Sequence, residues 1–185
     1  MRETTSILIF QAAWGLLILI AVAATLAFED APKKQAGFLT NLPVVVPFVL
    51  AFGFFYVRWF WGHYQAIPAL QIAGVAVMVL GLLGYMASML SLRRNWSFFA
   101  SIKEGHRLVI TGPYKYVRHP MYFFMILAIL GSGFLISNFL IILYTPFIGV
   151  IYYLRAKKEE ELLKEELPEY KNYVRETKML IPGIF

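Results

Sequence analysis

Long runs of apolar residues make up most of the chain, and short polar segments separate them. Stretches of about 17 or more residues with few charges are long enough for a helix to cross the hydrocarbon core of a bilayer. Five such stretches are present, at residues 6–28, 42–62, 66–92, 121–137 and 138–154. The pattern therefore predicts an all-α integral membrane protein with five transmembrane helices.

The last two apolar runs meet at Ser137 and Asn138 with almost no connecting loop. This spacing predicts a tight helical hairpin, whose two other ends emerge on the same side of the membrane. The polar segments attached to those ends are residues 93–120 and 155–185. We therefore expect both segments to lie together at the inner lipid boundary and to form one pocket, which the C-terminal helical segment closes.

Small residues in two of the runs carry separate predictions. Ala21-Val22-Ala23 resembles a signal-peptide cleavage box, which is an alternative for the first run. Glu3 in the leader and the continuation of the run to Phe28 favour a membrane span instead. Close packing against a neighbouring helix is expected at the glycines of the third run, Gly74, Gly81 and Gly84.

Composition supports a membrane protein and removes several kinds of chemistry. Hydrophobic residues make up 59% of the chain, charged residues 15%, and the mean hydropathy is +0.65, which is far from ordinary soluble usage. The 185 residues leave room for a single membrane domain, with the first three spans in residues 1–92. Cysteine is absent, which excludes disulfides, thiolate metal sites and cysteine nucleophiles.

Positive charge is distributed unevenly across the five predicted crossings. Of the 17 lysines and arginines, 15 fall on one side, and cytoplasmic loops are the ones that carry such an excess. We therefore expect the N-terminus outside the cell and the C-terminus in the cytoplasm. The net charge of +6 is then explained by loops that face the anionic headgroups of membrane lipids, and no nucleic-acid partner is expected.

The polar segment before the fourth run is rich in aromatic and basic residues. Pro120 suits the first turn of a helix and biases His119 toward a capping position. The amides at this helix start, the positive end of its dipole and the Arg118 side chain predict an anion site suited to a carboxylate or a phosphate. The simpler alternative is that Arg118 anchors the helix to lipid headgroups and that His119 only caps it.

The segment after the fifth run is predicted to continue as a helix, to break near Pro168, and to resume through Tyr170 and Tyr173. Its apolar positions share one face, since Leu163, Leu167 and Tyr170 recur at helical spacing. This stripe marks the side of the helix that is expected to face the rest of the protein.

Charged residues flank this apolar stripe. Glu159 and Glu160 fall beside it, whereas Glu161 points the opposite way. Arg155 lies four residues before Glu159 and shares its face, which predicts pairing between the two or joint contact with a ligand. The alternative is a charged helix face that water simply solvates.

Several catalytic motifs are missing from the sequence. There is no glycine-rich phosphate loop, dinucleotide fingerprint, HExxH pair or GxSxG elbow. Their absence argues against nucleotide hydrolysis, soluble-type dehydrogenase, zinc protease and serine hydrolase chemistry. His106 and His119 lie 13 residues apart with no third ligand of their kind in the loop, so no metal site is expected.

Four ordered elements make the second half of the chain recognisable. They are GHRLV at 105–109, GPY at 112–114, RHPMY at 118–122, and Arg155 followed by EEELL at 159–163. Over about residues 95–182, this set resembles the isoprenylcysteine carboxyl methyltransferase family. The wider superfamily also contains phospholipid N-methyltransferases and membrane sterol reductases with a related C-terminal core, which limits the inference about substrate.

The resemblance implies an integral membrane enzyme in which residues 93–185 form the cofactor-binding catalytic core. The implied cofactor is S-adenosylmethionine, and the implied partner is a lipophilic or lipidated acceptor that enters from the bilayer. Such a cofactor has a carboxylate, an ammonium group, a ribose and a sulfonium, and it suits acidic partners in a water-poor, aromatic cleft. Carried over by position, the cofactor-binding residues are His106, Leu108, Tyr116, Val117, Arg118, His119, Pro120, Tyr122, Glu160 and Glu161, with helix-face geometry favouring Glu160 over Glu161.

The chemistry of the acceptor decides the catalytic roles expected for Arg155 and Glu159. A carboxylate acceptor is already ionised at neutral pH and needs only a cation that holds it in line. We expect carboxyl methylation in which Arg155 orients the acceptor and Glu159 orients Arg155. A lipid amine acceptor would instead need a base such as Glu159. An NADPH-dependent membrane reductase and a non-enzymatic binding or transport protein are the further alternatives.

Two features depart from the family's pattern. Lys178 stands where family members commonly have an arginine, and lysine keeps the charge but lacks the bidentate fork of arginine. The chain also lacks a long extra N-terminal membrane region, which predicts a compact, prokaryotic-type member with an open choice of acceptor.

Overall fold

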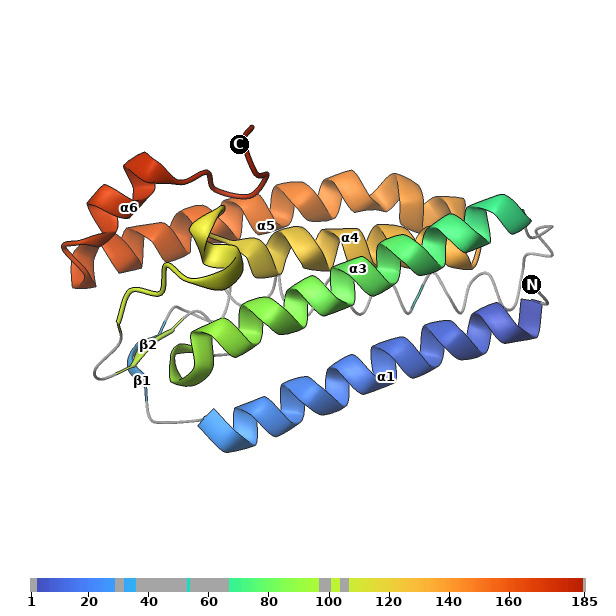
Figure 1. Ribbon diagram of the computed structural model, residues 1–185, viewed down its shortest axis with the longest axis horizontal. Helices are drawn as coiled ribbons and strands as arrows, with labels where there is room; N and C mark the ends of the chain where they lie inside the picture. Colours follow the sequence, from blue (N-terminus) through green and yellow to red (C-terminus); the bar gives the residue numbers. More distant parts are fainter. Residues whose placement is uncertain are drawn as a thin grey trace.

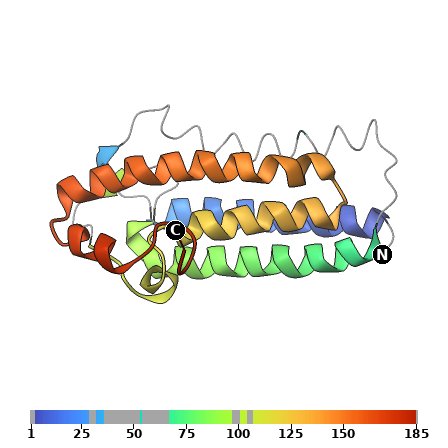
Figure 2. The ribbon, with the colours of Figure 1, turned by 90° about the horizontal axis from the view of Figure 1, so that it is seen from above.

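A computed structural model describes residues 3–28, 32–35, 53, 67–96, 101–103 and 107–184. Its long helices are α1 (Glu3–Phe28), α3 (Pro68–Leu92), α4 (Pro120–Leu135) and α5 (Phe139–Glu166), which run lengthwise beside one another (Figures 1 and 2). The second predicted span, 42–62, lies outside the described residues except for position 53, and so does His106. The helical bundle predicted from the apolar runs is present for the other four.

Two of the described helices, α3 and α5, are long and apolar enough to cross a membrane, and Thr5–Ile20 and Pro120–Leu135 form shorter apolar helices. The apolar part of α5 ends near Leu154, and the same helix continues without a break into a charged extension that reaches Glu166. This extension carries the acidic residues beyond the apolar part of the bundle.

The predicted hairpin between the last two runs is confirmed, with its turn at residues 136–138. Ser137 has a φ of 49°, in the left-handed region, and Asn138 caps α5. The Asn138 side-chain oxygen accepts hydrogen bonds from the amides of Leu140 at 3.0 Å and Ile141 at 3.3 Å. A cap of this kind satisfies amides that have no partner within the helix, which fixes where α5 begins.

Glycines allow α3 and α4 to approach each other closely, as the sequence predicts. A Cβ on Gly74 would lie 2.2 Å from the amide nitrogen of Leu135, and one on Gly131 would lie 2.3 Å from that of Met78. Gly81 and Gly84 meet α4 in the same way, at the Ala128 amide and the Phe124 ring. Because these contacts are largely with backbone atoms, side-chain rearrangement cannot relieve them.

Replacing Gly131 with alanine is expected to lower the thermal stability of the detergent-solubilised protein. The added methyl group clashes with the α3 backbone, and such overpacking costs about 1–3 kcal/mol. Gly15→Ala in α1 is the matched control, since nothing lies within 4 Å of a Cβ there. It should leave the melting temperature unchanged or raise it, because alanine favours helix over glycine. Equal melting temperatures for the two variants would contradict close packing at Gly131.

A short antiparallel ribbon was not predicted from the sequence. Strand β1 (Pro32–Gln35) pairs with β2 (Ser101–Lys103), in a register that places Lys34 opposite Ile102 and Gln35 opposite Ser101. The all-α prediction is correct for the bundle and misses this ribbon, because neither segment has an alternating pattern. The two loops lie at the same end of the bundle (Figure 1), and pairing satisfies their backbone groups. The sequence predicts that both loops lie on one side of the membrane, and the pairing is compatible with that prediction.

The C-terminal part confirms the predicted break and resumption of the helix. α5 ends at Glu166, Pro168 lies in the turn, and α6 (Tyr170–Glu176) follows. In Figure 1, α6 and the chain after it return alongside the loop that precedes α4. That loop contains a 3₁₀ turn, η2 (Gly112–Lys115), and a second one, η1 (Arg93–Asn95), directly follows α3.

Candidate functional site

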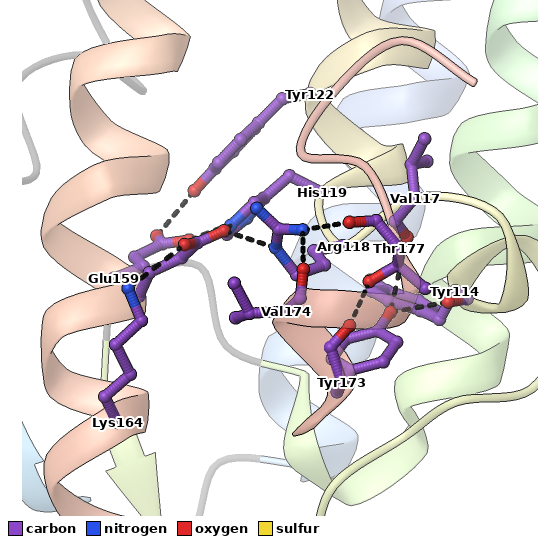
Figure 3. A network of polar contacts seen from close by, with 11 residues as sticks. Tyr114, Val117, Arg118, His119, Tyr122, Glu159, Lys164, Tyr173, Val174 and Thr177 are labelled. Atoms are coloured by element: carbon purple, nitrogen blue, oxygen red, sulfur yellow. Dashed lines mark hydrogen bonds and ion pairs between the residues drawn. The ribbon is translucent and has the colours of Figure 1, made fainter. Parts of the chain in front are cut away.

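The predicted helix start at His119 and Pro120 is present. Pro120 is the first residue of α4, where its missing amide hydrogen costs nothing, and His119 occupies the capping position. The His119 side chain makes no capping hydrogen bond, however, and faces the charged extension of α5 instead. Its Nδ1 lies 3.6 Å from Glu159 Oε2, and its Nε2 lies 3.4 Å from Glu160 Oε1 (Figure 3). The imidazole therefore lies within ion-pair distance of two carboxylates.

Arg155 and Glu159 pair on one face of α5, as their spacing predicts. Arg155 Nε lies 3.0 Å from Glu159 Oε1, and the arginine is only 3% exposed. Arg155 Nε also donates to the Tyr122 hydroxyl at 2.6 Å, and this hydroxyl donates to Glu159 Oε1 at 2.5 Å. The three groups form a closed triangle across α4 and α5, so each of them restricts the orientation of the other two.

Three aromatic rings stack behind this triangle. The His119 and Tyr122 rings lie 5.6 Å apart and nearly parallel, at 5°. The Tyr122 and Tyr152 rings lie 4.9 Å apart, at 8°. The guanidinium carbon of Arg155 is 5.7 Å from the centroid of the Tyr122 ring. The stack leaves Tyr122 little freedom to rotate, which fixes the position of its hydroxyl between Arg155 and Glu159.

Arg118 connects α5 to the C-terminal segment. Its Nε donates to Glu160 Oε1 at 2.6 Å, and both side chains are almost fully buried. Its Nη1 donates to the carbonyl oxygens of Val174, at 3.2 Å, and Thr177 (Figure 3). The guanidinium therefore ties together the loop before α4, the charged extension of α5 and the residues around the end of α6.

The anion site predicted at the start of α4 stays a prediction, and the structure shows which partners within the protein its groups already have. Glu160 already neutralises Arg118, and the amides of Arg118 and His119 donate to the carbonyl oxygens of Lys178, at 2.9 Å, and Met179, at 3.0 Å. Val117 and Lys178 form a parallel bridge at the same place. The burial of the Arg118 side chain within the protein argues against the alternative of a headgroup anchor. Lys178 contributes its backbone carbonyl to this contact.

Tyr173 forms a second tie between α6 and the loop before α4. Its hydroxyl donates to the Tyr114 carbonyl at 2.5 Å and lies 3.4 Å from that of Val117 (Figure 3). Burial raises the pKa of Tyr173 to about 12, so the hydroxyl remains a donor at neutral pH. The prediction that the two polar segments lie together is thereby confirmed, whereas an enclosed cofactor pocket between them stays a prediction.

The residues assigned by resemblance do not all lie in this network. Arg118, His119, Tyr122, Glu159 and Glu160 come together with Arg155. Val117 and Pro120 are buried directly beside the network, and Leu108 packs against the cluster of Leu167, Tyr170 and Tyr173. Tyr116, which is 65% exposed, and the exposed Glu161 point away from it.

Sequence reasoning missed the roles of Tyr152 and Tyr173. Tyr152 lies three residues before Arg155 and therefore on the same face of α5, and Tyr173 lies three residues after Tyr170 on the apolar stripe. Helical spacing from a residue already singled out was the signal that would have found both. Their partners cannot be predicted from sequence spacing, because tertiary packing brings Tyr152 to Tyr122 and Tyr173 to the Tyr114 carbonyl.

Glu160 is held in its ionised form. Burial alone would raise its pKa, but the contacts with His119 and Arg118 outweigh burial and lower the pKa to about 2. Lys164 Nζ adds a further positive charge 3.6 Å from Glu160 Oε2. Glu160 therefore carries a negative charge at every pH at which the protein is expected to work.

Acidification is expected to destabilise the protein through Glu160. The folded-state pKa of about 2 lies below the usual glutamate value of 4.5, so the stabilisation is complete above about pH 4.5 and is lost as the pH falls toward 2. Melting temperatures measured between about pH 6 and about pH 3 test this loss of stability. Glu160→Gln should flatten the decline, whereas Glu161→Gln, at the exposed neighbour, should not. An equally steep decline in both variants would contradict this assignment.

Metal ligation is not supported by the described part of the chain. Among those residues, no group of three or more histidine, aspartate or glutamate side chains is placed to hold a metal ion. The site consists instead of two arginines, two glutamates, a histidine and tyrosines from α4, α5 and the segments around them.

Residues 74–165 match the isoprenylcysteine carboxyl methyltransferase (ICMT) family. The solved structure of the eukaryotic intramembrane Ras methyltransferase ICMT has the same fold, with a TM-score of 0.73 and 21% sequence identity. That similarity covers 98% of this chain and 68% of the solved one.

Two curated bacterial relatives carry metal-resistance names. They are the nickel-cobalt-cadmium resistance protein NccN of Alcaligenes xylosoxydans xylosoxydans, 31% identical over 112 residues, and the cobalt-zinc-cadmium resistance protein CzcN of Cupriavidus metallidurans, 30% identical over 111 residues. The alignments cover 59% and 58% of this chain, and the chain spans about half the length of these relatives, 51% and 50%. The family match extends from α3 through most of α5 and includes the Arg118, His119, Arg155 and Glu160 network, and the chain belongs to the isoprenylcysteine carboxyl methyltransferase family.

Proposed function

We propose that this chain is a membrane methyltransferase that uses S-adenosylmethionine to methylate the carboxylate of a lipophilic acceptor. The methyltransferases of its family use this methyl donor. The observation that carries the proposal is the buried Arg155, held by Glu159 and Tyr122 where the apolar part of α5 ends. A guanidinium in this position can bind a carboxylate whose apolar tail remains in the lipid.

The residues present fit the methyl donor. His119 Nε2 is a buried polar atom without a hydrogen-bond partner in the described structure, and it lies beside the ionised Glu160. A zwitterionic, hydrogen-bonding ligand suits such a donor set. We assign its binding to His119, Glu160 and the Arg118 that orients Glu160, with Val117, Pro120, Tyr122 and Leu108 as neighbours. The exposed Tyr116 and Glu161 are left out of this set.

The proposed reaction mainly requires that the enzyme align the acceptor carboxylate with the methyl group of the donor. The methyl donor supplies an electrophilic methyl group on a positively charged sulfur. The acceptor carboxylate is ionised at neutral pH, so no proton has to be removed before it attacks. Arg155 holds this carboxylate, while Glu159 and Tyr122 fix the guanidinium in one orientation. The stacked rings of His119, Tyr122 and Tyr152 keep water away from the same place.

A lipid amine is the second candidate acceptor, and it would require a general base. Glu159 is the nearest carboxylate to Arg155, but it already accepts hydrogen bonds from Arg155 and Tyr122. Both bonds are accepted by Oε1, so this oxygen orients Arg155 and Tyr122, a role that favours a carboxylate acceptor over an amine. Reduction with NADPH is the alternative from a different reaction class.

Labelled S-adenosylmethionine with membrane lipid and with a prenylated cysteine analogue tests the proposal. A labelled product that mild base hydrolyses is an ester and supports carboxyl transfer. A base-stable product indicates an amine acceptor and contradicts the carboxylate assignment. Saturable binding of NADPH without binding of S-adenosylhomocysteine would overturn the methyltransferase proposal as a whole.

We also propose that the single domain crosses the membrane five times, with the N-terminus outside and residues 93–185 forming a cytoplasmic core. The absence of cysteine from the chain makes this directly testable. Single cysteines at Thr5 and Lys171 can be labelled in intact cells with a membrane-impermeant maleimide. Labelling at Thr5 and protection at Lys171 are expected, and the reverse pattern would overturn the orientation.

A further inference from the structure

The hydroxyl of Tyr170 is buried and has no hydrogen-bond partner among the described residues. Tyr170 is the first residue of α6 and is only 2% exposed. It lies in an apolar cluster with Leu167 and Tyr173, against which Leu108 packs. A buried hydroxyl without a partner destabilises the folded state, so its presence here calls for an explanation.

Tyr170 lies on a helix that contacts the charged part of the site, because Arg118 Nη1 donates to the carbonyl oxygen of Val174, four residues further along α6. The Tyr170 and Tyr173 rings lie 5.7 Å apart, and the Tyr173 hydroxyl bonds to the loop that carries Arg118. Burial raises the pKa of Tyr170, the Glu160 charge raises it further and the Arg118 charge opposes this, so the hydroxyl stays protonated. His119 Nε2, 3.4 Å from Glu160 Oε1, is likewise buried without a hydrogen-bond partner among the described residues.

We propose that Tyr170 is a ligand-binding residue whose hydroxyl binds the amino-acid end of S-adenosylmethionine beside the Glu160 and Arg118 pair. This inference rests on the proposed use of that cofactor. Opposite charges side by side complement a group that carries both an ammonium and a carboxylate, whereas the adenosine part is uncharged. The site would then extend past residue 165, where the family match ends, into α6.

Calorimetric titration with S-adenosylhomocysteine tests this without any turnover. Tyr170→Phe removes one hydrogen bond to a charged group, which should weaken binding about tenfold. 5′-Methylthioadenosine, which lacks the amino-acid end, should bind wild type and Tyr170→Phe with the same affinity. If Tyr170→Phe lost the same affinity for both ligands, contact with the amino-acid end would be refuted. If it lost affinity for neither ligand, ligand binding by Tyr170 would be refuted.

The stability of the ligand-free protein gives a second test, because Tyr170→Phe should weaken ligand binding without lowering the stability of the fold. Tyr170→Phe removes an unpaired buried hydroxyl and should raise the melting temperature, or at least keep it. Tyr173→Phe is the matched control from the same helix, and it should lower the melting temperature because it breaks the bonds to the Tyr114 and Val117 carbonyls. A lower melting temperature for Tyr170→Phe would mean that its hydroxyl serves the fold, contrary to the proposal.

The outcome for wild type separates this inference from the proposed function. Wild type that binds neither S-adenosylhomocysteine nor 5′-methylthioadenosine would refute both. Wild type and Tyr170→Phe that bind S-adenosylhomocysteine equally well would refute only the role of Tyr170.

Discussion

Glu160→Ala is expected to destabilise the protein by about 3–5 kcal/mol and to abolish detectable binding of S-adenosylhomocysteine. The reason for the first effect is that Arg118 would remain buried without its compensating charge, 2.6 Å from where the Glu160 oxygen was. The second effect follows because the carboxylate proposed to meet the ligand's ammonium group is gone. Chemical or thermal unfolding in detergent and calorimetric titration measure the two effects.

Two further variants test whether the loss of stability comes from the unpaired charge of Arg118. Glu161→Ala, at the exposed neighbour on the same helix, should change the free energy of unfolding by no more than about 0.5 kcal/mol. Arg118→Met combined with Glu160→Met should recover most of the lost stability, because no charge is left unpaired, yet should still fail to bind the ligand. Similar stability losses in Glu160→Ala and Glu161→Ala would show that the Arg118 pair is unimportant for the fold.

Arg155→Lys is expected to lower kcat by about 100-fold or more while S-adenosylhomocysteine binding changes little. Lysine keeps the positive charge but cannot hold Tyr122, Glu159 and a carboxylate at once with a planar fork. Steady-state rates with a prenylated cysteine analogue, together with calorimetry, separate the two quantities. The effect on the rate should therefore exceed the effect on cofactor affinity.

Variants at Tyr122 and Lys158 distinguish the positioning of the Arg155 side chain from the effect of charge on the helix. Tyr122→Phe keeps the aromatic stack with Tyr152 and loses only the hydroxyl, so a smaller loss of kcat, about tenfold, is expected. Lys158→Ala, an exposed position on the same helix, should retain wild-type rates. Full turnover of Arg155→Ala with an active acceptor would refute the proposed role of Arg155.

Local rules predicted much of the secondary structure around the site. A proline at a first helical turn, a proline that ends a helix and a four-residue spacing between opposite charges act over one or two turns. The start of α4 at Pro120, the break at Pro168 and the pair of Arg155 with Glu159 therefore follow from spacing alone. Gly74 and Gly81 were predictable for the same reason, since small residues repeat along one helix face.

Contacts between distant segments escaped the same rules. Arg118 and Glu160 are 42 residues apart, and Arg118 reaches the Thr177 carbonyl 59 residues away. A basic residue at a helix start equally suits an external anion, a lipid headgroup and a partner within the protein. The return of the C-terminal segment showed that Arg118 has a partner within the protein, Glu160, and that the amides of Arg118 and His119 meet the Lys178 and Met179 carbonyls.

The sequence by itself determined that the chain forms apolar helices, where most of them begin and end, and which charges share a face of α5, because periodicity and proline chemistry act locally. The tertiary structure decided which buried charges neutralise one another and that β1 pairs with β2. It also decided that the Tyr170 hydroxyl and His119 Nε2 have no hydrogen-bond partner among the described residues. These features depend on how segments far apart in the chain come together, and the free energy of burying a polar group depends on what lies opposite it.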